Sequence, residues 1–459
     1  MSGLPHPSDV TRRILAEAGS DATVLMSDGS EAEVRVANNT VTTNGQRRSR
    51  TVTVVVFDER PDGVAAGVAS RSGDVDIHEL VAAARHDAAN APLATDAAPL
   101  VGGPGHGAES DEVPETSLEV MGDVLDSLRE LTARAESRGV TLAGFFSHAL
   151  ATTTVATSAG AYRRFTQPTG SVQLVARADG GQRSTWRGLS TPYFRDVPMD
   201  ELEADLYRRL EWAQRRIELP AGRYETIMSP STVADMMAYL YFSNEGPDAA
   251  QGRTVFSTPG GGTRNGEKIS SLPFTLYSDP FAAGLECRPF VATSASSTTE
   301  SVFDNAMDIE RTDWIRDGVI NDLRFHRAGA AEAGRPRATP GIDNIILEAG
   351  GTASLDDMIA SSERALLINT LWYIRSVDPA TLLLTGLTRD GVYLVEDGKV
   401  TGQVNNFRFN ESPLDLLTRA TEAGVSELTL PREFDEFYRA RTCSLRIPDF
   451  NMSSVSPAS

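Results

Sequence analysis

Cysteine is rare in this sequence: Cys287 and Cys443 are the only two among 459 residues. Two thiols cannot build a disulfide framework, and unpaired cysteines are typical of cytoplasmic proteins, so we expect a cytoplasmic location. Long apolar runs are also missing, because the longest, residues 52–57, has only the length of a strand. This excludes a helix that spans a membrane, which needs about 18 or more apolar residues. Residues 1–14 contain prolines and charges where a signal peptide would need an apolar core.

Lysine is nearly absent as well. Lys268 and Lys399 are the only lysines, and all other basic residues are arginines. The arginines are spread over the whole chain, which is more typical of a GC-rich genome than of a phosphate-binding site. The 43 basic residues are outnumbered by 63 acidic ones, which gives a formal net charge of −20. Such a chain repels a phosphate backbone on average, so we expect no nucleic-acid partner.

The remaining composition is that of an ordinary folded protein. Hydrophobic residues make up 40% and charged residues 23% of the chain, which excludes a wholly disordered protein. A chain of this length is too long for one core, so we expect several units. The predicted units are residues 1–100, residues 101–218 with an acidic linker at their start, and residues 219–459.

The first two units are each predicted to be α+β. Asp28-Gly29 is a strong hairpin signal, because both positions of a tight two-residue turn need a positive φ. It predicts that residues 23–27 and 31–37 form two strands that fold back on each other. Residues 92–115 are rich in Ala, Gly, Pro and acidic residues and predict a mobile linker. Hydrophobic periodicity predicts the other elements: helices over residues 9–18, 77–89, 118–135 and 202–217, and strands over residues 51–57, 142–148, 152–157 and 171–178.

Residues 219–459 are predicted to form a strand-rich, mostly antiparallel β domain with few helices, which makes the whole chain α+β. Ser229-Pro230 is a good N-cap and first-turn pair for a helix that runs to about residue 242. Short apolar runs alternate with turns such as Asp397-Gly398. The strands expected from these runs are residues 224–228, 366–370, 382–386, 392–395 and 400–405, with one more helix over residues 414–423.

The residues alone show no catalytic centre. Zinc takes about four clustered ligands, but no two of the six histidines have the spacing of three to five residues that one helical face requires. The G-x-S-x-G elbow of many hydrolases is absent. Residues 261–268, GGTRNGEK, come close to a phosphate loop, yet Glu267 stands where the loop needs its lysine. Residues 293–301 are rich in hydroxyl groups and are best interpreted as a flexible loop.

Three segments resemble the TldD/PmbA family, and their order and spacing cover nearly the whole chain. Residues 36–45, VANNTVTTNG, are similar to the family's N-terminal strand-and-turn signature. Residues 366–410 resemble its C-terminal block, a strand followed by a segment that ends in E-x-G-K. Residues 443–454, CSLRIPDFNMSS, are similar to its closing strand.

The resemblance implies membership of a family that contains two kinds of protein, which pair with each other. The TldD kind carries H-E-x-x-x-H and a cysteine that hold zinc, and the PmbA or TldE kind lacks these ligands. In this sequence Asn244 and Ala249 stand where the two histidines would be, and of the motif only Glu245 remains. Pro247 disfavours continuing the helix that would project two imidazoles together. Cys443 lies after the position of the family's ligand cysteine, around residue 431, so we interpret it as an ordinary buried thiol.

The resemblance therefore implies a subunit that binds no metal and has no catalytic or cofactor-binding residue of its own. A TldD-type partner would supply the zinc, and the pair would degrade or process extended peptides such as leader peptides and small antitoxin-like proteins. An extended peptide is commonly held by strand addition. The alternative is a non-proteolytic protein that binds or presents peptides, and a self-sufficient hydrolase with an unrecognised site is a third.

Overall fold

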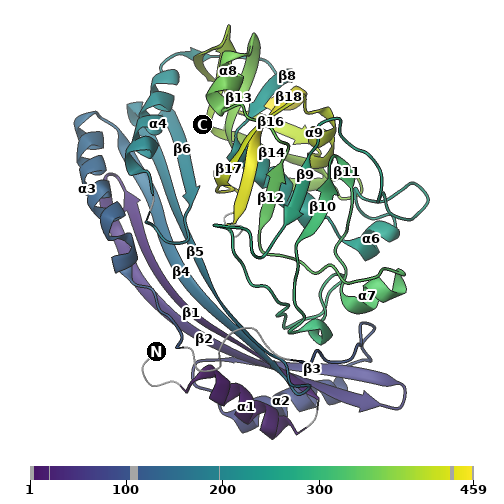
Figure 1. Cartoon of the computed structure of the whole chain (residues 1–459). Helices are drawn as coiled ribbons and strands as arrows, with labels where there is room; N and C mark the ends of the chain where they lie inside the picture. Colours follow the sequence, from purple (N-terminus) through teal and green to yellow (C-terminus); the bar gives the residue numbers. More distant parts are fainter. Residues whose placement is uncertain (1–4, 20, 104–111, 196, 435–438, 457–459) are drawn as a thin grey trace.

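The computed structural model describes residues 5–19, 21–103, 112–195, 197–434 and 439–456. Within these residues the strands form two sheets, one of six strands and one of twelve. The six-stranded sheet is long and curved, and the C-terminal domain lies on its concave side (Figure 1). None of the described helices is both long and apolar enough to cross a bilayer.

The N-terminal sheet has the strand order β3-β2-β1-β4-β5-β6, and every neighbouring pair is antiparallel. Its strands are β1 (Ala22–Ala37), β2 (Thr40–Arg60), β3 (Gly63–Ser72), β4 (Thr141–Thr157), β5 (Tyr162–Ala178) and β6 (Arg183–Ser190). The helices of this region are α1 (Pro7–Ala18), α2 (Ile77–Asn90), α3 (Gly122–Ser137) and α4 (Met199–Trp212).

Side chains alternate between the two faces of β1, as they must in a strand. Val24 and Met26 pack with α1 and α2 at one end of the sheet, and Val34 packs with α3 and α4 at the other. Leu25 points to the opposite face, where it packs against Phe303 of the C-terminal domain. One face of the sheet is thus covered by two helix pairs and the other by the C-terminal domain (Figure 1).

The predicted hairpin at Asp28-Gly29 is wrong, because β1 runs straight through both residues. Asp28 is paired with Arg50 on β2 and with Thr152 on β4, and neither Asp28 nor Gly29 has a positive φ. The buried Asp28 carboxylate accepts a hydrogen bond of 2.5 Å from Arg50 Nε. An arginine that is distant in sequence thus stabilises an extended aspartate at a site whose local sequence favours a turn.

The two predicted α+β halves of the N-terminal region share one sheet. Residues 23–36 of β1 pair with residues 144–157 of β4, which joins the strands before residue 100 to those after it. The separate strands predicted over residues 142–148 and 152–157 are one strand, β4. The helix predicted over residues 202–217 ends at Trp212, because Arg216–Ile217 pair with the C-terminal sheet instead.

The predicted linker is only partly described, since residues 104–111 lie outside the described ranges. Residues 92–103 of this segment are held by hydrogen bonds to the rest of the protein. Ala94 N donates to Val64 O at 2.8 Å. The Asp96 carboxylate, 8% exposed, accepts a hydrogen bond of 2.6 Å from Ser296 Oγ of the C-terminal domain. For residues 92–103 the prediction of a mobile segment is therefore wrong.

The C-terminal domain is strand-rich and mostly antiparallel with few helices, as predicted, and the α+β class is confirmed. Its strands are β7 (Arg216–Ile217), β8 (Gly222–Met228), β9 (Thr275–Ser278), β10 (Thr312–Arg316), β11 (Val319–Ile320), β12 (Ile345–Glu348), β13 (Arg364–Asp378), β14 (Leu383–Glu396), β15 (Lys399–Val404), β16 (Phe407–Glu411), β17 (Glu422–Thr429) and β18 (Ala440–Val455). Its helices are α5 (Pro230–Phe242), α6 (Gly246–Ala250), α7 (Arg327–Glu332), α8 (Leu355–Ala360) and α9 (Pro413–Arg419).

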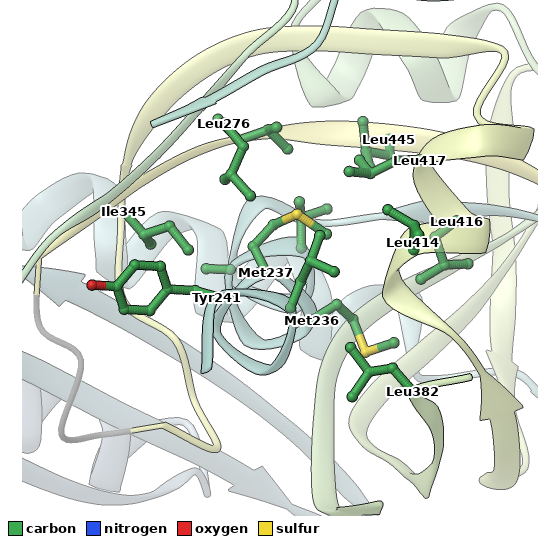
Figure 2. Packing of buried hydrophobic residues seen from close by; sticks show 14 of the residues in the cluster. Met236, Met237, Tyr241, Leu276, Ile345, Leu382, Leu414, Leu416, Leu417 and Leu445 are labelled. Carbon is green, nitrogen blue, oxygen red and sulfur yellow. The ribbon is translucent and has the colours of Figure 1, made fainter. Parts of the chain in front are cut away.

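The largest hydrophobic core of the molecule lies around α5. Figure 2 shows Met236, Met237 and Tyr241 of this helix surrounded by apolar side chains from the sheet and from α9. A helix that is apolar on every side must be buried, and α5 carries only one charged residue, Asp235. Strands β12, β13, β17 and β18 and helix α9 all contact α5, which positions the segment that follows it.

Candidate functional site

Helix α5 leads into the segment in which the sequence predicted a degenerate metal motif. Ser229 caps the helix by accepting a hydrogen bond from Thr232 N, and Pro230 occupies the first turn, as predicted. The helix ends at Phe242, and a new short helix, α6, begins at Gly246. A Cβ atom on Gly246 would lie 2.0 Å from the ring of Phe325, so this tight break requires glycine.

The structure places Asn244 within this break and Ala249 in α6. Asn244 is 1% exposed and Ala249 is 0% exposed. The amide nitrogen of Asn244 donates a long hydrogen bond of 3.5 Å to Asp322 O, and its amide oxygen is buried without a hydrogen-bond partner. Both side chains are therefore enclosed, and Ala249 is packed into the hydrophobic core.

Glu245 lies between them and contacts a cation from elsewhere in the chain. Its carboxylate is 3.5 Å from the guanidinium of Arg324 and accepts a hydrogen bond of 3.4 Å from Thr298 Oγ1. The Arg324 side chain is 9% exposed, and it donates to the carbonyl oxygens of Phe242 at 2.9 Å and Asn244 at 3.3 Å. These carbonyls belong to the negative end of the α5 dipole, where a cation is stabilised. Arg324 thus caps the helix and neutralises Glu245.

A second polar cluster surrounds Asp235, closer to the N-terminus of α5. Asp235 is fully buried, and its Oδ1 accepts hydrogen bonds from Glu433 N at 2.9 Å and Phe434 N at 3.3 Å. Burial raises the pKa of Asp235 to about 8, against the lowering effect of these two N–H groups. At neutral pH the protonated carboxyl therefore holds the loop after β17 against the helix.

The N-terminus of α5 faces a cavity of about 550 Å³ between the two domains, lined also by β6 and α4. Asp205 of α4 is ion-paired there with Arg187 and Arg209, each at 2.9 Å, and with Arg208 at 2.7 Å. Burial alone would raise the pKa of Asp205, but the Arg209 and Arg187 guanidinium groups outweigh it and lower that pKa. Arg208 also pairs with Asp356 of α8 at 2.9 Å, so the cluster ties the two domains together.

The comparisons with known proteins decide the family. Residues 221–454, more than half of the chain, match the family described as "PmbA/TldA metallopeptidase C-terminal domain". The chain belongs to the PmbA/TldD family. The family predicted from the sequence motifs is thereby confirmed. No curated protein matches the sequence.

Solved structures share the fold of this PmbA/TldD protein over nearly its whole length. TldE from Thermococcus kodakarensis superposes with a TM-score of 0.77 at 17% identity, covering 96% of this chain and 99% of that one. A proposed modulator of DNA gyrase from Thermotoga maritima gives 0.77 at 14% identity, with 96% and 99% coverage. A similarly described protein from Bacteroides thetaiotaomicron gives 0.74 at 15% identity, with 98% and 100% coverage. At identities this low, the superpositions establish a common fold.

The motif positions of this PmbA/TldD chain do not fit a zinc ion. Ala249 has no donor atom, and Asn244 is a poor ligand compared with imidazole. The carboxylate at the glutamate position of the motif, Glu245, is paired with the Arg324 guanidinium, and Asp248 is paired with Arg253. Among the described residues, no group of three or more His, Cys, Asp or Glu side chains is arranged to hold a metal.

The two cysteines are buried in the same domain and are 0% exposed. Burial raises the pKa of each thiol, Cys287 and Cys443, to about 12. A thiol with such a pKa is protonated at neutral pH, and only the thiolate is a metal ligand or nucleophile. The interpretation of Cys443 as an ordinary buried thiol agrees with this environment.

The sequence reasoning missed Arg324, Asp235 and Glu433. Asp235 carried a usable signal, because a single charge in a helix that is apolar on all sides must be buried, and buried ionisable groups often mark functional sites. Arg324 and Glu433 had no such signal. Each reaches α5 from a loop that is more than 75 residues away in the sequence.

Proposed function

We propose that this chain is the PmbA/TldE-type subunit of a heteromeric zinc peptidase, and that a TldD-type partner carries the metal. The observation that carries the proposal is the state of the degenerate motif. Ala249 is buried in the core without a donor atom, and the cation beside Glu245 is the Arg324 guanidinium. A chain built in this way has no place for the zinc-bound water on which such a peptidase depends, so its contribution is to bind and position the peptide.

An extended peptide is the ligand class that the C-terminal sheet supports. Within the described residues β17 pairs as a strand with β18 alone. On its other edge Val425 N donates to Ala353 O at 2.9 Å, so the part of that edge that we propose for an added strand is residues 426–429. Leu428 on this part of the strand is 37% exposed, and an added strand would cover it. Backbone hydrogen bonds at a strand edge give affinity with little demand on sequence, which suits unfolded peptides and leader peptides.

The test compares the chain alone with the chain co-expressed with a TldD-type protein. We expect a stable complex that cleaves an unstructured peptide and loses this activity with a chelator. The lone chain should be inactive and should contain no stoichiometric zinc by mass spectrometry. Chelator-sensitive cleavage by the lone chain would overturn the proposal. Peptide binding without any complex would favour a non-proteolytic peptide-binding protein instead.

A matched pair of variants separates assembly from peptide binding. Leu428→Asp places a charge on the exposed edge strand, whereas Leu428→Asn introduces a side chain of the same size without a charge. We expect the first to lower peptide cleavage by the complex without weakening the complex itself, because a desolvated carboxylate opposes strand addition. The second should leave cleavage nearly unchanged. Equal effects of both variants would argue against β17 as the peptide-binding edge.

A further inference from the structure

Strand β13 contains a bulge close to the C-terminal end of α5. Trp372 pairs with Leu387 on β14, and the next paired residue is Arg375, so Tyr373 and Ile374 have no partner on β14. Tyr373 adopts a positive φ of 54°. A bulge leaves its extra residues outside the ladder and redirects their polar groups. Two successive backbone N–H groups are therefore available to a ligand other than the neighbouring strand.

These two N–H groups hold a carboxylate, that of Glu433. Tyr373 N donates to Glu433 Oε2 at 2.9 Å, and Ile374 N donates to Oε1 at 3.0 Å. The guanidinium of Arg375 donates to Oε1 at 3.2 Å. Paired backbone donors beside an arginine are a donor set that suits a planar carboxylate, since each oxygen receives a charge-assisted hydrogen bond.

The loop that carries Glu433 is also held to α5 by contacts that do not involve the Glu433 side chain. The loop is held to α5 through its backbone, because Asp235 Oδ1 accepts from Glu433 N and Phe434 N. Phe434 adds a ring contact with Tyr239 at 4.6 Å. A rotation of the Glu433 side chain would expose the three donors, and the backbone and ring contacts between the loop and α5 would remain.

The surroundings suit a peptide. Tyr373 is 57% exposed, and Arg375 lies over its ring at 4.3 Å. Phe242, which is 43% exposed, contacts Phe434 at 5.4 Å between ring centroids. Exposed aromatic rings next to a few directed polar groups are typical of binding surfaces. The same end of α5 carries Glu245, so this surface borders the degenerate motif.

We propose that the bulge at Tyr373–Arg375 is a carboxylate-recognition site for a peptide, and that Glu433 fills it in cis as an internal competitor. The ligand is a peptide carboxylate, from either the C-terminus or an acidic side chain. This inference rests on the proposed function only in taking a peptide as the ligand. It requires neither the zinc nor the partner subunit.

Competition by Glu433 makes a quantitative prediction. A ligand that binds only the open site has an apparent dissociation constant equal to the intrinsic one divided by the open fraction. With Glu433 in place the open fraction is small, so the wild-type chain binds carboxylates weakly. Removal of the Glu433 carboxylate leaves the site open in every molecule, so the dissociation constant of a peptide with a free carboxylate falls. The dissociation constant of the corresponding peptide amide does not change.

The experiment measures fluorescence anisotropy of an N-terminally labelled, unstructured peptide with the purified chain alone. Three peptides are compared: one without acidic residues and with a free C-terminus, its C-terminal amide, and an amide that carries one internal Glu. For Glu433→Ala we expect the dissociation constant of at least one carboxylate peptide to fall at least about tenfold below the wild-type value. The neutral amide should be unchanged. The first and third peptides show whether the terminal or the side-chain carboxylate is preferred.

Three further variants control the result. Glu396→Ala removes an exposed acid from the same domain, one that pairs with Arg364 at 3.7 Å, and tests for an effect of net charge alone. Glu433→Gln keeps the shape but loses the charge and should give an intermediate gain. Arg375→Met in the Glu433→Ala background should abolish the preference for acid over amide. Thermal melting establishes that each variant is folded.

The proposal is overturned if Glu433→Ala binds acid and amide equally, or if Glu396→Ala gives the same gain. Should the Glu433 variants fail to fold, the wild-type chain decides: at high peptide concentration it must prefer an acid to its amide, and equal binding rejects the site. Failure of the chain to join a metal-bearing partner would leave these constants unchanged, so the two hypotheses fail separately.

Discussion

The Arg324 guanidinium lies 3.5 Å from the Glu245 carboxylate, in the break between α5 and α6. This pairing assigns the acidic residue at the glutamate position of the motif to a cation that the chain itself provides. Arg324 also donates to two carbonyl groups at the end of α5. Arg324 thus serves as a cap at the C-terminal end of α5.

Arg324→Met should destabilise the chain by about 1–3 kcal/mol, because it leaves helix-terminal carbonyls without their donor and the half-buried Glu245 without its cation. Arg253 offers the matched control: it pairs with Asp248 at 2.7 Å nearby, but its side chain is 55% exposed. Arg253→Met should cost less than about 1 kcal/mol. Urea unfolding measures both. Equal losses would show that Arg324 has no special role as a cap.

Restoring the histidines should not restore a metal site. In an Asn244→His/Ala249→His double variant, position 249 has no room for an imidazole, since Ala249 is 0% exposed. Overpacking of this kind costs about 1–3 kcal/mol. We expect a lower Tm and no stoichiometric zinc by mass spectrometry, with Asn244→His as the single-site control. One bound zinc per chain would contradict the misfit described above.

Asp235 should make stability depend on pH. Because burial raises its folded pKa from 3.8 to about 8, the folded state retains a proton that the unfolded state releases. Below pH 3.8 Asp235 is protonated in both states and has no effect on the free energy of unfolding. Between pH 3.8 and about 8 the free energy of unfolding falls as the pH rises, and above about 8 the effect of Asp235 is constant. Asp235→Asn still offers an oxygen to Glu433 N and Phe434 N, so the variant should gain stability over the wild type across that window. A difference that does not change with pH would refute the shifted pKa.

Arg50→Met should be costly because it leaves the Asp28 carboxylate, 0% exposed, without its partner. Loss of one member of a buried ion pair costs about 3–5 kcal/mol. Arg47 provides a control on the same strand, since its pair with Glu31 at 2.7 Å involves an arginine that is 79% exposed. Arg47→Met should change the free energy of unfolding by less than about 1 kcal/mol. The result is read from chemical denaturation, and similar losses for both variants would argue against a special role for the buried pair.

Local sequence determined the elements whose signals lie within a few residues. Ser229 and Pro230 fix the start of α5, and the apolar residues on all sides of this helix indicate that it is buried. Asp397-Gly398 forms the predicted turn between β14 and β15. The family follows from short motifs in the right order. The absence of histidine at positions 244 and 249, where the family resemblance expects the metal ligands, can also be read without coordinates.

Only the tertiary structure decided the features that depend on partners distant in the chain. Asp28-Gly29 is extended because Arg50 pairs with Asp28 inside a sheet. Arg324 reaches Glu245 across 79 residues, and Glu433 reaches the β13 bulge across 60, so neither contact leaves a local pattern. The physical reason is common to all three contacts. A buried charge needs a partner of opposite charge or a hydrogen-bond donor, and that partner can come from any part of the fold, so the sequence around the charge does not show which residue it is.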